Sequence, residues 1–522
     1  MNMAIGFVPE INEQFQRALD VMEKTDGHVF ITGKAGTGKS TLLEYFRTIT
    51  RKKIAVLAPT GVAALNVQGQ TIHSFFRFRP DITPDTVKKL GRKKENIYTK
   101  LDAIVIDEIS MVRADLMDCV DRFLRLNGKH PRKLFGGLQM IFIGDLYQLP
   151  PVVTSAEKDL FTAHYDSPYF FSSQAFRRTD FDMEFVELEK IYRQTEADFI
   201  GLLNVIRNRS VGEEDIRRLN ERCDPEFVPP DDDFYITLTS TNDLAAARNR
   251  EKLETLPEKM HSYRGFVEGE FKKSSFPTDE ILNLKVGAQI MMVNNDYKGR
   301  WVNGTLGKIV EVRKEKNADD ILFVELQTGG EVEVRPHMWE LFRFSYDKDS
   351  QKITSETVGS FIQYPLRLAW AVTIHKSQGK TFDKVIIDIG RGTFAHGQVY
   401  VALSRCTNFR GIVLKKEIRK SHIWMDYHVV RFLTQYQYRK AEERLPAEER
   451  RAAIREAIRR GALLEIVYLK PDDTKSRRTI RPEALEMMEY RGRRFEGIRA
   501  YCFERKETRH FRLDRILEIA GG

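Results

Sequence analysis

The chain has 522 residues, a length at which about three to five domains are expected and which excludes a small disulfide-stapled scaffold. Hydrophobic residues make up 42% of it and charged residues 30%, a balance that supports buried cores and excludes wholesale disorder. The net charge is +9, and residues 431–522 supply +7 of it through 23 basic against 16 acidic side chains. The charge therefore permits a polyanionic partner, chiefly at the C-terminal end.

The cysteine pattern and the hydropathy bear on the cellular compartment. The four cysteines stand far apart and never form a CxxC pair, which gives no support for a zinc knuckle or a disulfide framework: Cys119, Cys223, Cys406 and Cys502. The N-terminus lacks a charged leader followed by a long apolar run, and no apolar stretch of about 18 residues occurs later. We therefore expect a cytoplasmic protein with no membrane association.

The first part of the chain alternates predicted helices with short apolar strands. Residues 11–24 place Phe15, Leu19 and Met22 at helical spacing, and residues 28–32 read as a buried strand that runs into GKAGTGKST. Further apolar runs begin at Ile54, Leu101 and Met140 and are separated by helical stretches. This order predicts a parallel α/β sheet.

A second set of predicted strands indicates a second α/β lobe. These runs begin at Asp233, Lys384 and Gly411. Between them, residues 300–345 switch to short strands with turn signals at Asn303-Gly304 and Gly329-Gly330, which suggests a small inserted antiparallel barrel. Residues 440–460 are charged and helix-prone, and the chain is strand-rich from Leu463 onward.

Residues 33–40 fit the pattern GxxxxGK[ST], after a strand and before a helix. Glycines allow backbone N–H groups to wrap phosphates, and the following helix adds its dipole. Lys39 can neutralise phosphate charge, and the Ser40 hydroxyl can ligate Mg²⁺. The sequence therefore predicts a nucleotide-phosphate loop.

Polar residues elsewhere suggest the partners of this loop. Asp107-Glu108, at the end of a predicted buried strand, offers one carboxylate for a metal and a neighbour that can activate water. Gln148 is a candidate sensor of the γ-phosphate and Gln14 a candidate reader of adenine, although a surface glutamine is the commoner case. Arg193 and Arg405 are candidates for stabilising transition-state charge from the second lobe, with a structural role as the alternative.

Seven blocks, in order, carry a resemblance to a known family. They are NEQ at 12–14, GKAGTGKST at 33–41, APTGVAALNVQGQTIHSFF at 58–76, IDEISMV at 106–112, GDLYQLPPV at 145–153, WAVTIHKSQGKTFD at 370–383 and VYVALSRC at 399–406. They resemble the superfamily 1 helicases, specifically the petite-integration-frequency family of 5′-to-3′ DNA helicases, which is related to the RecD subunit. Residues 118–137 resemble that family's signature segment, and the resemblance covers roughly residues 1–425.

The resemblance implies residue roles. The implied catalytic set is Lys39, Asp107, Glu108 (as base), Gln148, Arg193 and Arg405. The implied ATP-binding set is Gln14 (contacting adenine), Gly33, Ala35, Gly36, Thr37, Gly38, Lys39, Ser40, Thr41 and Gly379, with Ser40 and Asp107 serving Mg²⁺. The implied DNA-binding set is Pro59, Thr60, Gly61, His73, Phe75, His375, Lys376 and Ser377, whose chemistry suits contacts to single-stranded DNA.

Aromatic and basic residues follow the third block. Phe75, Phe76 and Phe78 interleave with arginines and could form a stacking face or a strand-splitting wedge, and a local hydrophobic core is at least an equal alternative. The basic run from Lys88 to Lys94 could hold phosphate, or it could be a solvated loop.

The C-terminal region resembles a WYL domain. Residues 463–519 alternate aromatic and basic side chains, and FRLDRI at 511–516 matches the family pattern well. Residues 495–498 read FEGI where the family consensus is Trp-Tyr-Leu, which puts any role of that tryptophan in doubt. The predicted ligand face is Tyr468, Arg481, Arg499, Tyr501, Arg505 and Arg512, with packing or protein contact as the alternative role.

These observations predict a mixed α/β fold with two tandem RecA-like motor lobes. We expect the first lobe at 1–185 with a small wedge insertion at about 75–100, and the second at 186–430 with a small β-barrel inserted at about 300–365. A linker helix at 431–455 and a β-rich WYL domain at 456–522 complete the expected division.

The resemblance implies an ATP- and Mg²⁺-dependent translocase and helicase that moves 5′-to-3′ on single-stranded DNA and acts on forked or structured DNA. The WYL domain would assist DNA binding or regulate the motor. A nucleoid-associated location and work in DNA repair, recombination and telomere maintenance are implied in the same way. We expect a monomer, with a DNA-induced dimer as the alternative.

Two other functions compete with this one. The first is an ATP-switched nucleic-acid-sensing regulator without processive unwinding, against which the complete set of Lys39, Glu108, Gln148 and Arg405 argues. The second is a RecD-like subunit that works only inside a nuclease complex. The signature segment and the appended C-terminal domain argue for a free-standing motor.

Overall fold

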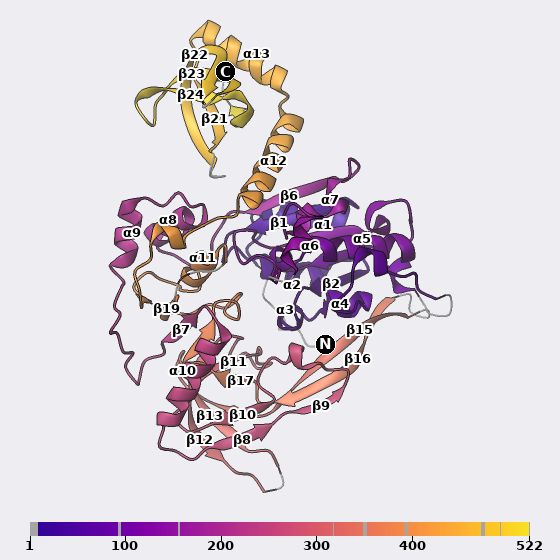
Figure 1. The fold of residues 1–522 in the computed structure, drawn as a ribbon, viewed down its shortest axis with the longest axis vertical. Helices are drawn as coiled ribbons and strands as arrows, with labels where there is room; N and C mark the ends of the chain where they lie inside the picture. Colours follow the sequence, from indigo (N-terminus) through magenta and orange to yellow (C-terminus); the bar gives the residue numbers. More distant parts are fainter. Residues whose placement is uncertain are drawn as a thin grey trace. The chain divides into compact units, whose positions relative to one another are not determined.

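The computed structural model describes residues 9–91, 96–154, 157–316, 318–347, 352–390, 392, 395–470, 475–490 and 492–520 (Figure 1). The chain divides into two compact units. The first consists of Met1–Leu203 with Gly212–Ile423, and the second of Asn204–Val211 with Trp424–Gly522. Parallel sheets in the first unit and a β-rich second unit confirm the predicted fold class. None of the described helices is long and apolar enough to cross a membrane.

The first parallel sheet is built from the apolar runs that the sequence assigned to strands. Its order is β3-β2-β4-β5-β1-β6, and every neighbouring pair is parallel. The strands are β1 (His28–Gly33), β2 (Ile54–Ala58), β3 (Gln70–Thr71), β4 (Ala103–Ile106), β5 (Gln139–Ile143) and β6 (Met183–Leu188). Because parallel strands bring their carboxyl ends to one edge, the phosphate loop, the acidic pair and the block after β5 meet at that edge.

The helices of this lobe bury the apolar side chains that their spacing predicted. Phe15, Leu19 and Met22 of the first helix are buried in one core with residues of β1, β4 and β5, and Asn12 caps that helix by accepting a hydrogen bond from Phe15 N at 2.9 Å. The helices are α1 (Glu13–Lys24), α2 (Lys39–Ile49), α3 (Gly61–Asn66), α4 (Ile72–Phe76), α5 (Ala114–Asn127), α6 (Lys158–Thr162) and α7 (Gln174–Arg177).

The second lobe has a smaller parallel sheet of order β18-β7-β19-β20. Its strands are β7 (Ile236–Thr239), β18 (Ala371–Thr373), β19 (Val385–Asp388) and β20 (Ile412–Leu414), and the helices of this part of the chain are α8 (Ala197–Arg207), α9 (Glu213–Asn220), α10 (Asn242–Thr255) and α11 (Gln398–Leu403). The turn after β18 and helix α11 carry the last two of the seven blocks.

The insertion in the second lobe starts before residue 300, where we expected it to begin. Its strands are β8 (His261–Arg264), β9 (Phe266–Gly269), β10 (Ile281–Leu284), β11 (Gln289–Met292), β12 (Leu306–Arg313), β13 (Ile321–Leu326), β14 (Glu331–Val334), β15 (His337–Asp347), β16 (Lys352–Gln363) and β17 (Leu366–Leu368). They form an antiparallel sheet β14-β13-β12-β11-β17, a pair β10-β8 and a sheet β15-β16-β9. The long β15–β16 hairpin contacts the first lobe, where Gln70 Nε2 donates to Phe342 O.

The second unit joins two helices to a curved antiparallel sheet of order β24-β23-β22-β21-β25. The elements are α12 (Tyr427–Arg444), α13 (Ala447–Arg460), β21 (Leu464–Leu469), β22 (Lys475–Tyr490), β23 (Arg493–Cys502), β24 (Glu507–Arg512) and β25 (Ile516–Ala520). The region 431–455, which we expected to be a linker or a helix, lies in two helices, because Leu445, which precedes Pro446, is extended and separates them. Ile454 and Ala457 of α13 pack on Ile480 and Ile498 of the sheet.

Candidate nucleotide and DNA-binding site

The phosphate loop lies between β1 and α2, as the motif predicts. Gly36 and Gly38 adopt φ angles of +81° and +85°, in the left-handed region that favours glycine. Lys39 Nζ donates hydrogen bonds to Gly33 O at 2.7 Å and to Lys34 O at 3.0 Å, so the ammonium group lies over the loop. Ser40 and Thr41 follow in the first turn of α2. The loop therefore has the backbone and the cation that a nucleotide phosphate requires.

The acidic pair follows β4 at the same edge. Burial raises the pKa of Asp107, and the neighbouring Glu108 carboxylate raises it further. Burial also raises the pKa of Glu108, while the charges of Lys39 and Arg405 oppose that shift. Two half-buried carboxylates beside one lysine and the Ser40 hydroxyl form an oxygen-rich set, and oxygen is the ligand that Mg²⁺ prefers. The residues present therefore fit a nucleotide-bound Mg²⁺.

Glutamines complete this side of the site. Gln148 is buried in the turn after β5, where its side-chain amide donates to Asp145 Oδ2 at 3.4 Å. Gln378, which the sequence reasoning did not single out, donates from Nε2 to Glu108 Oε2 at 2.9 Å and to Gln148 Oε1 at 3.2 Å. Only its place inside the block at 370–383 signalled it. The contact joins the two lobes at the acidic pair.

The two arginines come to the same place. Arg193 Nη1 donates to Ser404 O at 3.2 Å, and a Cβ at Gly36 would lie 2.5 Å from Arg193 Cβ, so Arg193 lies directly against the phosphate loop. Arg405 is only 1% exposed and donates to Val401 O at 3.0 Å. Burial and the charge of Arg193 lower the pKa of Arg405 to about 9. The structure thus gathers the six predicted catalytic residues around one edge of the first sheet.

Two residues that were predicted to contact the nucleotide lie at the margins of this site. Gln14 lies in the first turn of α1, next to the capping residue Asn12, whose Nδ2 donates to Tyr192 OH at 3.4 Å. Gly379 is exposed, with φ of +79°, directly after Gln378. Their contacts with a nucleotide stay predictions.

The first lobe presents its predicted DNA contacts at the end of β2 and in two short helices. Thr60 caps α3 by accepting from Ala63 N at 3.2 Å, and Pro59 precedes it. Gly61 packs against the inserted region, since a Cβ there would lie 2.6 Å from Ser275 Oγ. His73 of α4 lies near Lys272 and Asp115, and burial lowers its pKa. This surface is therefore shared between α3, α4 and the insertion.

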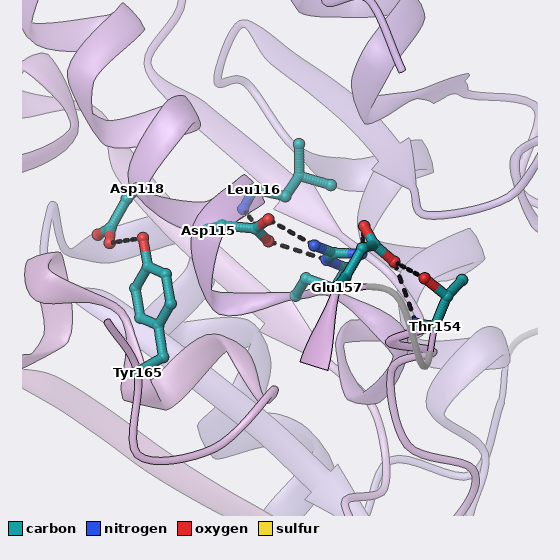
Figure 2. Close-up of polar contacts among 7 residues, drawn as sticks. Asp115, Leu116, Asp118, Thr154, Glu157 and Tyr165 are labelled. Carbon is teal, nitrogen blue, oxygen red and sulfur yellow. Dashed lines mark hydrogen bonds and ion pairs between the residues drawn. The ribbon is translucent and has the colours of Figure 1, made fainter. Parts of the chain in front are cut away.

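An ion-pair network joins the start of α5 to residues 154 and 157 (Figure 2). Arg113 donates from Nε and Nη2 to the two carboxylate oxygens of Asp115, at 3.0 and 2.8 Å, and from Nη1 to Glu157 at 2.8 Å. Glu157 in turn accepts from the backbone N and hydroxyl of Thr154. Arg113 thus ties the end of the acidic block to the segment that follows GDLYQLPPV.

The predicted DNA contacts of the second lobe lie in the turn after β18. Lys376 is exposed, and burial lowers the pKa of the half-buried His375. Lys376 also lines a cavity of about 250 Å³ together with Asn242, Arg250 and Arg367. Ser377 differs from expectation, because it is fully buried and its hydroxyl donates to Ile374 O at 2.7 Å. Its side chain holds the turn and is not presented to a strand.

Phe75 also differs from expectation. Its side chain is 6% exposed, and its ring packs at centroid distances of 4.9 Å from Phe76, 5.3 Å from Tyr98 and 6.2 Å from Phe344. These contacts favour the hydrophobic-core alternative over a base-stacking face, since the ring surface is used inside the protein. Residues 92–94 of the predicted basic run lie outside the described residues.

The predicted ligand face of the C-terminal domain divides between two sides of its sheet. Arg481 pairs across strands with Tyr501, and the guanidinium lies 5.7 Å from that ring's centroid. Arg499 and Arg512 lie on this same side, because their strand neighbours Ile498 and Phe511 point into the core that α13 covers. Tyr468 belongs to the covered side and packs against Phe511. Arg505 lies in the exposed turn between β23 and β24.

A phosphate loop, an acidic pair and two arginines gathered between two parallel α/β sheets define a two-lobed, RecA-like motor of the phosphate-loop class. Comparison with known proteins is more specific. The family model for PIF1-like helicase matches residues 9–216, that for the DNA helicase Pif1 2B domain matches residues 270–312, and that for the WYL domain matches residues 449–520.

Individual relatives agree with these matches. The chain is 31% identical over 450 residues to the ATP-dependent DNA helicase Pif1 of Bdellovibrio bacteriovorus, covering 83% of this chain and 95% of the relative. It is 33% identical to the human ATP-dependent DNA helicase PIF1 over 77% of this chain, and it spans about 60% of that relative's length. Unliganded Pif1 from Bacteroides sp superposes with a TM-score of 0.73 at 37% identity, covering 83% of this chain and 97% of that one. The chain belongs to the PIF1 helicase family and carries a C-terminal WYL domain.

Proposed function

We propose that this chain is an ATP- and Mg²⁺-dependent enzyme that moves 5′-to-3′ along single-stranded DNA and separates duplex DNA. One observation carries the proposal most. Lys39, Glu108 and Gln148 of the first lobe meet Arg193 and Arg405 at one edge, next to the turn that carries Lys376. Nucleotide chemistry and strand contact would therefore act on adjacent residues. The relatives described above are named ATP-dependent DNA helicases, which supports the same proposal.

The site residues divide the work of hydrolysis. Mg²⁺, held by Ser40, Asp107 and the nucleotide, would supply charge neutralisation on the phosphates. Lys39 and the loop amides would hold the β- and γ-phosphates, and Glu108 would orient and deprotonate the attacking water. Arg193 and Arg405 would stabilise the charge that develops on the γ-phosphate, with Gln148 placed to sense it. Gln14 and Gly379 would contact the nucleotide at its margins.

The proposed strand path follows exposed and half-buried residues of both lobes. Pro59, Thr60 and His73 would hold it in the first lobe, and His375 and Lys376 in the second. The neighbouring cavity has Arg250, Arg367 and Lys376 in its lining, together with Asp279. Pif1 from Bacteroides has been crystallised with ADP-AlF4 and with single-stranded DNA, which supports both ligands. The direction of movement rests on the resemblance to 5′-to-3′ helicases.

The C-terminal domain would add DNA affinity or regulate the motor through its outer arginine face, which consists of Arg481, Arg499 and Arg512. Forked DNA is a proposed substrate, because one solved relative concerns unwinding at forked duplex DNA by two coordinating Pif1 helicases. The two coordinating copies in that relative support a DNA-induced pair of copies as the alternative to a monomer. A cytoplasmic, nucleoid-associated location and roles in DNA repair and recombination belong to the proposal as well.

Directional movement can be tested without a duplex. Streptavidin is bound to a biotin at either the 3′ or the 5′ end of a single-stranded oligonucleotide, and its displacement is followed with ATP and Mg²⁺. The proposal expects ATP-dependent displacement from the 3′ end only. Displacement from the 5′ end only would reverse the polarity, and displacement from neither end would contradict a translocating motor.

A further inference from the structure

Gln378 occupies a position that joins two functions. It lies in the turn 373–380 after β18, two residues beyond the exposed Lys376, and its side chain reaches the acidic pair of the other lobe. Backbone hydrogen bonds brace the turn, since Ser377 N donates to Thr373 O at 3.0 Å and Lys380 N donates to Ser377 O at 3.0 Å. A displacement of this turn would therefore move the Gln378 side chain with it.

The amide of Gln378 matches its two acceptors chemically. A side-chain amide carries two N–H donors on one nitrogen, and Nε2 directs them to Glu108 Oε2 at 2.9 Å and Gln148 Oε1 at 3.2 Å. A carboxylate accepts only, so the nitrogen and not the oxygen of this amide must face Glu108. One side chain thus fixes the proposed base and the proposed γ-phosphate sensor together.

Glu108 has an uncommon backbone conformation, which the contacts around it must maintain. It adopts φ of +49° and ψ of +43°, a left-handed conformation that is uncommon for a residue with a side chain. Strain of this kind is maintained only when neighbouring contacts determine the geometry. Its side chain is held from across the lobe interface by Gln378.

We propose that Gln378 is a positioning residue that couples DNA engagement at the turn after β18 to the hydrolytic geometry of Glu108 and Gln148. This inference rests on the proposed function, because it concerns the same nucleotide and strand sites. A strand held by His375 and Lys376 would set the position of the turn, and the Gln378 amide would transmit that position to the base. Gln378 contacts the reacting groups only through Glu108 and Gln148.

The test uses the full chain with Gln378→Ala and Gln378→Glu. The first removes the amide, and the second keeps its volume but places an acceptor beside the Glu108 carboxylate. Gln327→Ala is the matched control, because that half-buried glutamine lies in the inserted region and its side chain donates a long bond, 3.4 Å, to Asp383. Melting curves confirm that each variant is folded.

Two readouts separate coupling from simple loss of activity. In steady-state hydrolysis with saturating single-stranded DNA, both Gln378 variants should lose about 10–100-fold in kcat, as for other residues that orient a catalytic ligand, with KM for ATP changed less than about threefold. In fluorescence anisotropy with a labelled oligo-dT, ADP plus aluminium fluoride should change the DNA affinity of the unmodified chain by about 5–150-fold. That ratio should fall toward one in both variants, with nucleotide-free DNA affinity retained.

The possible outcomes distinguish the coupling role of Gln378 from the proposed helicase function. If the unmodified chain shows DNA-stimulated hydrolysis and both Gln378 variants retain its kcat and its affinity ratio, the coupling role is overturned and the helicase proposal stands. A variant that loses nucleotide-free DNA binding as well would show that Gln378 supports the strand site itself, which also overturns the inference. Absence of DNA-stimulated hydrolysis in the unmodified chain would overturn both.

Discussion

The hydroxyl of Tyr400, in α11, accepts a hydrogen bond from Ala35 N of the phosphate loop at 2.9 Å, although 365 residues separate them in sequence. An amide that would face a bound phosphate is therefore engaged by the second lobe. Loop amides that hold a protein oxygen must exchange it before they hold a phosphate oxygen.

This contact predicts that Tyr400→Phe binds nucleotide more tightly. The substitution removes the competing hydroxyl, together with its long bond to Asp145 Oδ2 at 3.5 Å. One intramolecular hydrogen bond contributes about 0.5–1.5 kcal/mol, so release of the Ala35 amide should raise the affinity by about 2–10-fold. Titration with a fluorescent ATP analogue in the absence of DNA measures the change. Unchanged or weaker binding would show that Tyr400 organises the loop for its ligand and does not compete with it.

Lys39→Ala should abolish DNA-stimulated ATP hydrolysis, because the ammonium group lies over the loop where phosphate charge would accumulate. Release of inorganic phosphate with and without single-stranded DNA is the measurement. Lys24→Ala, at an exposed lysine of α1 paired with Asp20, is the control and should hydrolyse ATP normally. Turnover by the Lys39 variant would remove the assignment of the phosphate loop.

The outer arginine face of the C-terminal domain predicts a salt-dependent share of DNA affinity. Simultaneous Arg481→Ala, Arg499→Ala and Arg512→Ala should weaken single-stranded DNA binding and reduce the slope of log K against log salt by about 2, at about 0.7 per phosphate contact. The control replaces three exposed arginines of α13 with alanine: Arg455, Arg459 and Arg460. If both triple variants weaken DNA binding equally, the loss reflects net charge and not a defined binding face. If the first triple variant binds DNA normally, the domain's role is packing or protein contact.

His28 predicts a loss of stability in mild acid. Met140 N donates to its Nδ1 at 3.1 Å and the ring packs against Phe135 and Phe181, so burial lowers its pKa from 6.5 to about 4. Between pH 4 and pH 6.5, the range set by these two pKa values, the unfolded chain binds more protons than the folded chain. The free energy of unfolding therefore increases with pH in this range and decreases on acidification.

At pH 5 the expected loss from this one group is about 2 kcal/mol relative to pH 7.5. The melting temperature of a His28→Asn variant should therefore fall less between these pH values than that of the unmodified chain, whereas the exposed His164→Asn should behave like the unmodified chain. An identical acid-induced decrease in all three proteins would contradict the neutral, buried state of His28.

The sequence predicted the strands and the loops after them because both depend on local pattern. The runs at 28–32, 101–108 and 140–145 are apolar enough to be buried on both faces, and such strands form parallel sheets whose carboxyl ends share one edge. That rule alone brings Lys39, Glu108 and Gln148 together. The second-lobe partners followed from the resemblance and not from any spacing.

What the sequence could not supply depends on contacts between distant segments. The burial of Phe75 comes from packing against Tyr98 and against Phe344 of an insertion whose path no local pattern sets. Ser377 and Gln378 are neighbours in one polar stretch, yet one side chain is fully buried in its own turn and the other crosses to Glu108. Hydrophobic periodicity and secondary-structure propensity predict neither the burial of Ser377 nor the contact of Gln378 with Glu108, because the tertiary arrangement decides both.

The most direct test of the account is unwinding of a short duplex that carries a single-stranded tail at either its 5′ or its 3′ end, with ATP and Mg²⁺ present. A 5′-to-3′ helicase should separate the strands of the 5′-tailed duplex only, and Lys39→Ala should separate neither duplex. Unwinding of the 3′-tailed duplex alone, or of neither duplex despite DNA-stimulated hydrolysis, would contradict a 5′-to-3′ helicase.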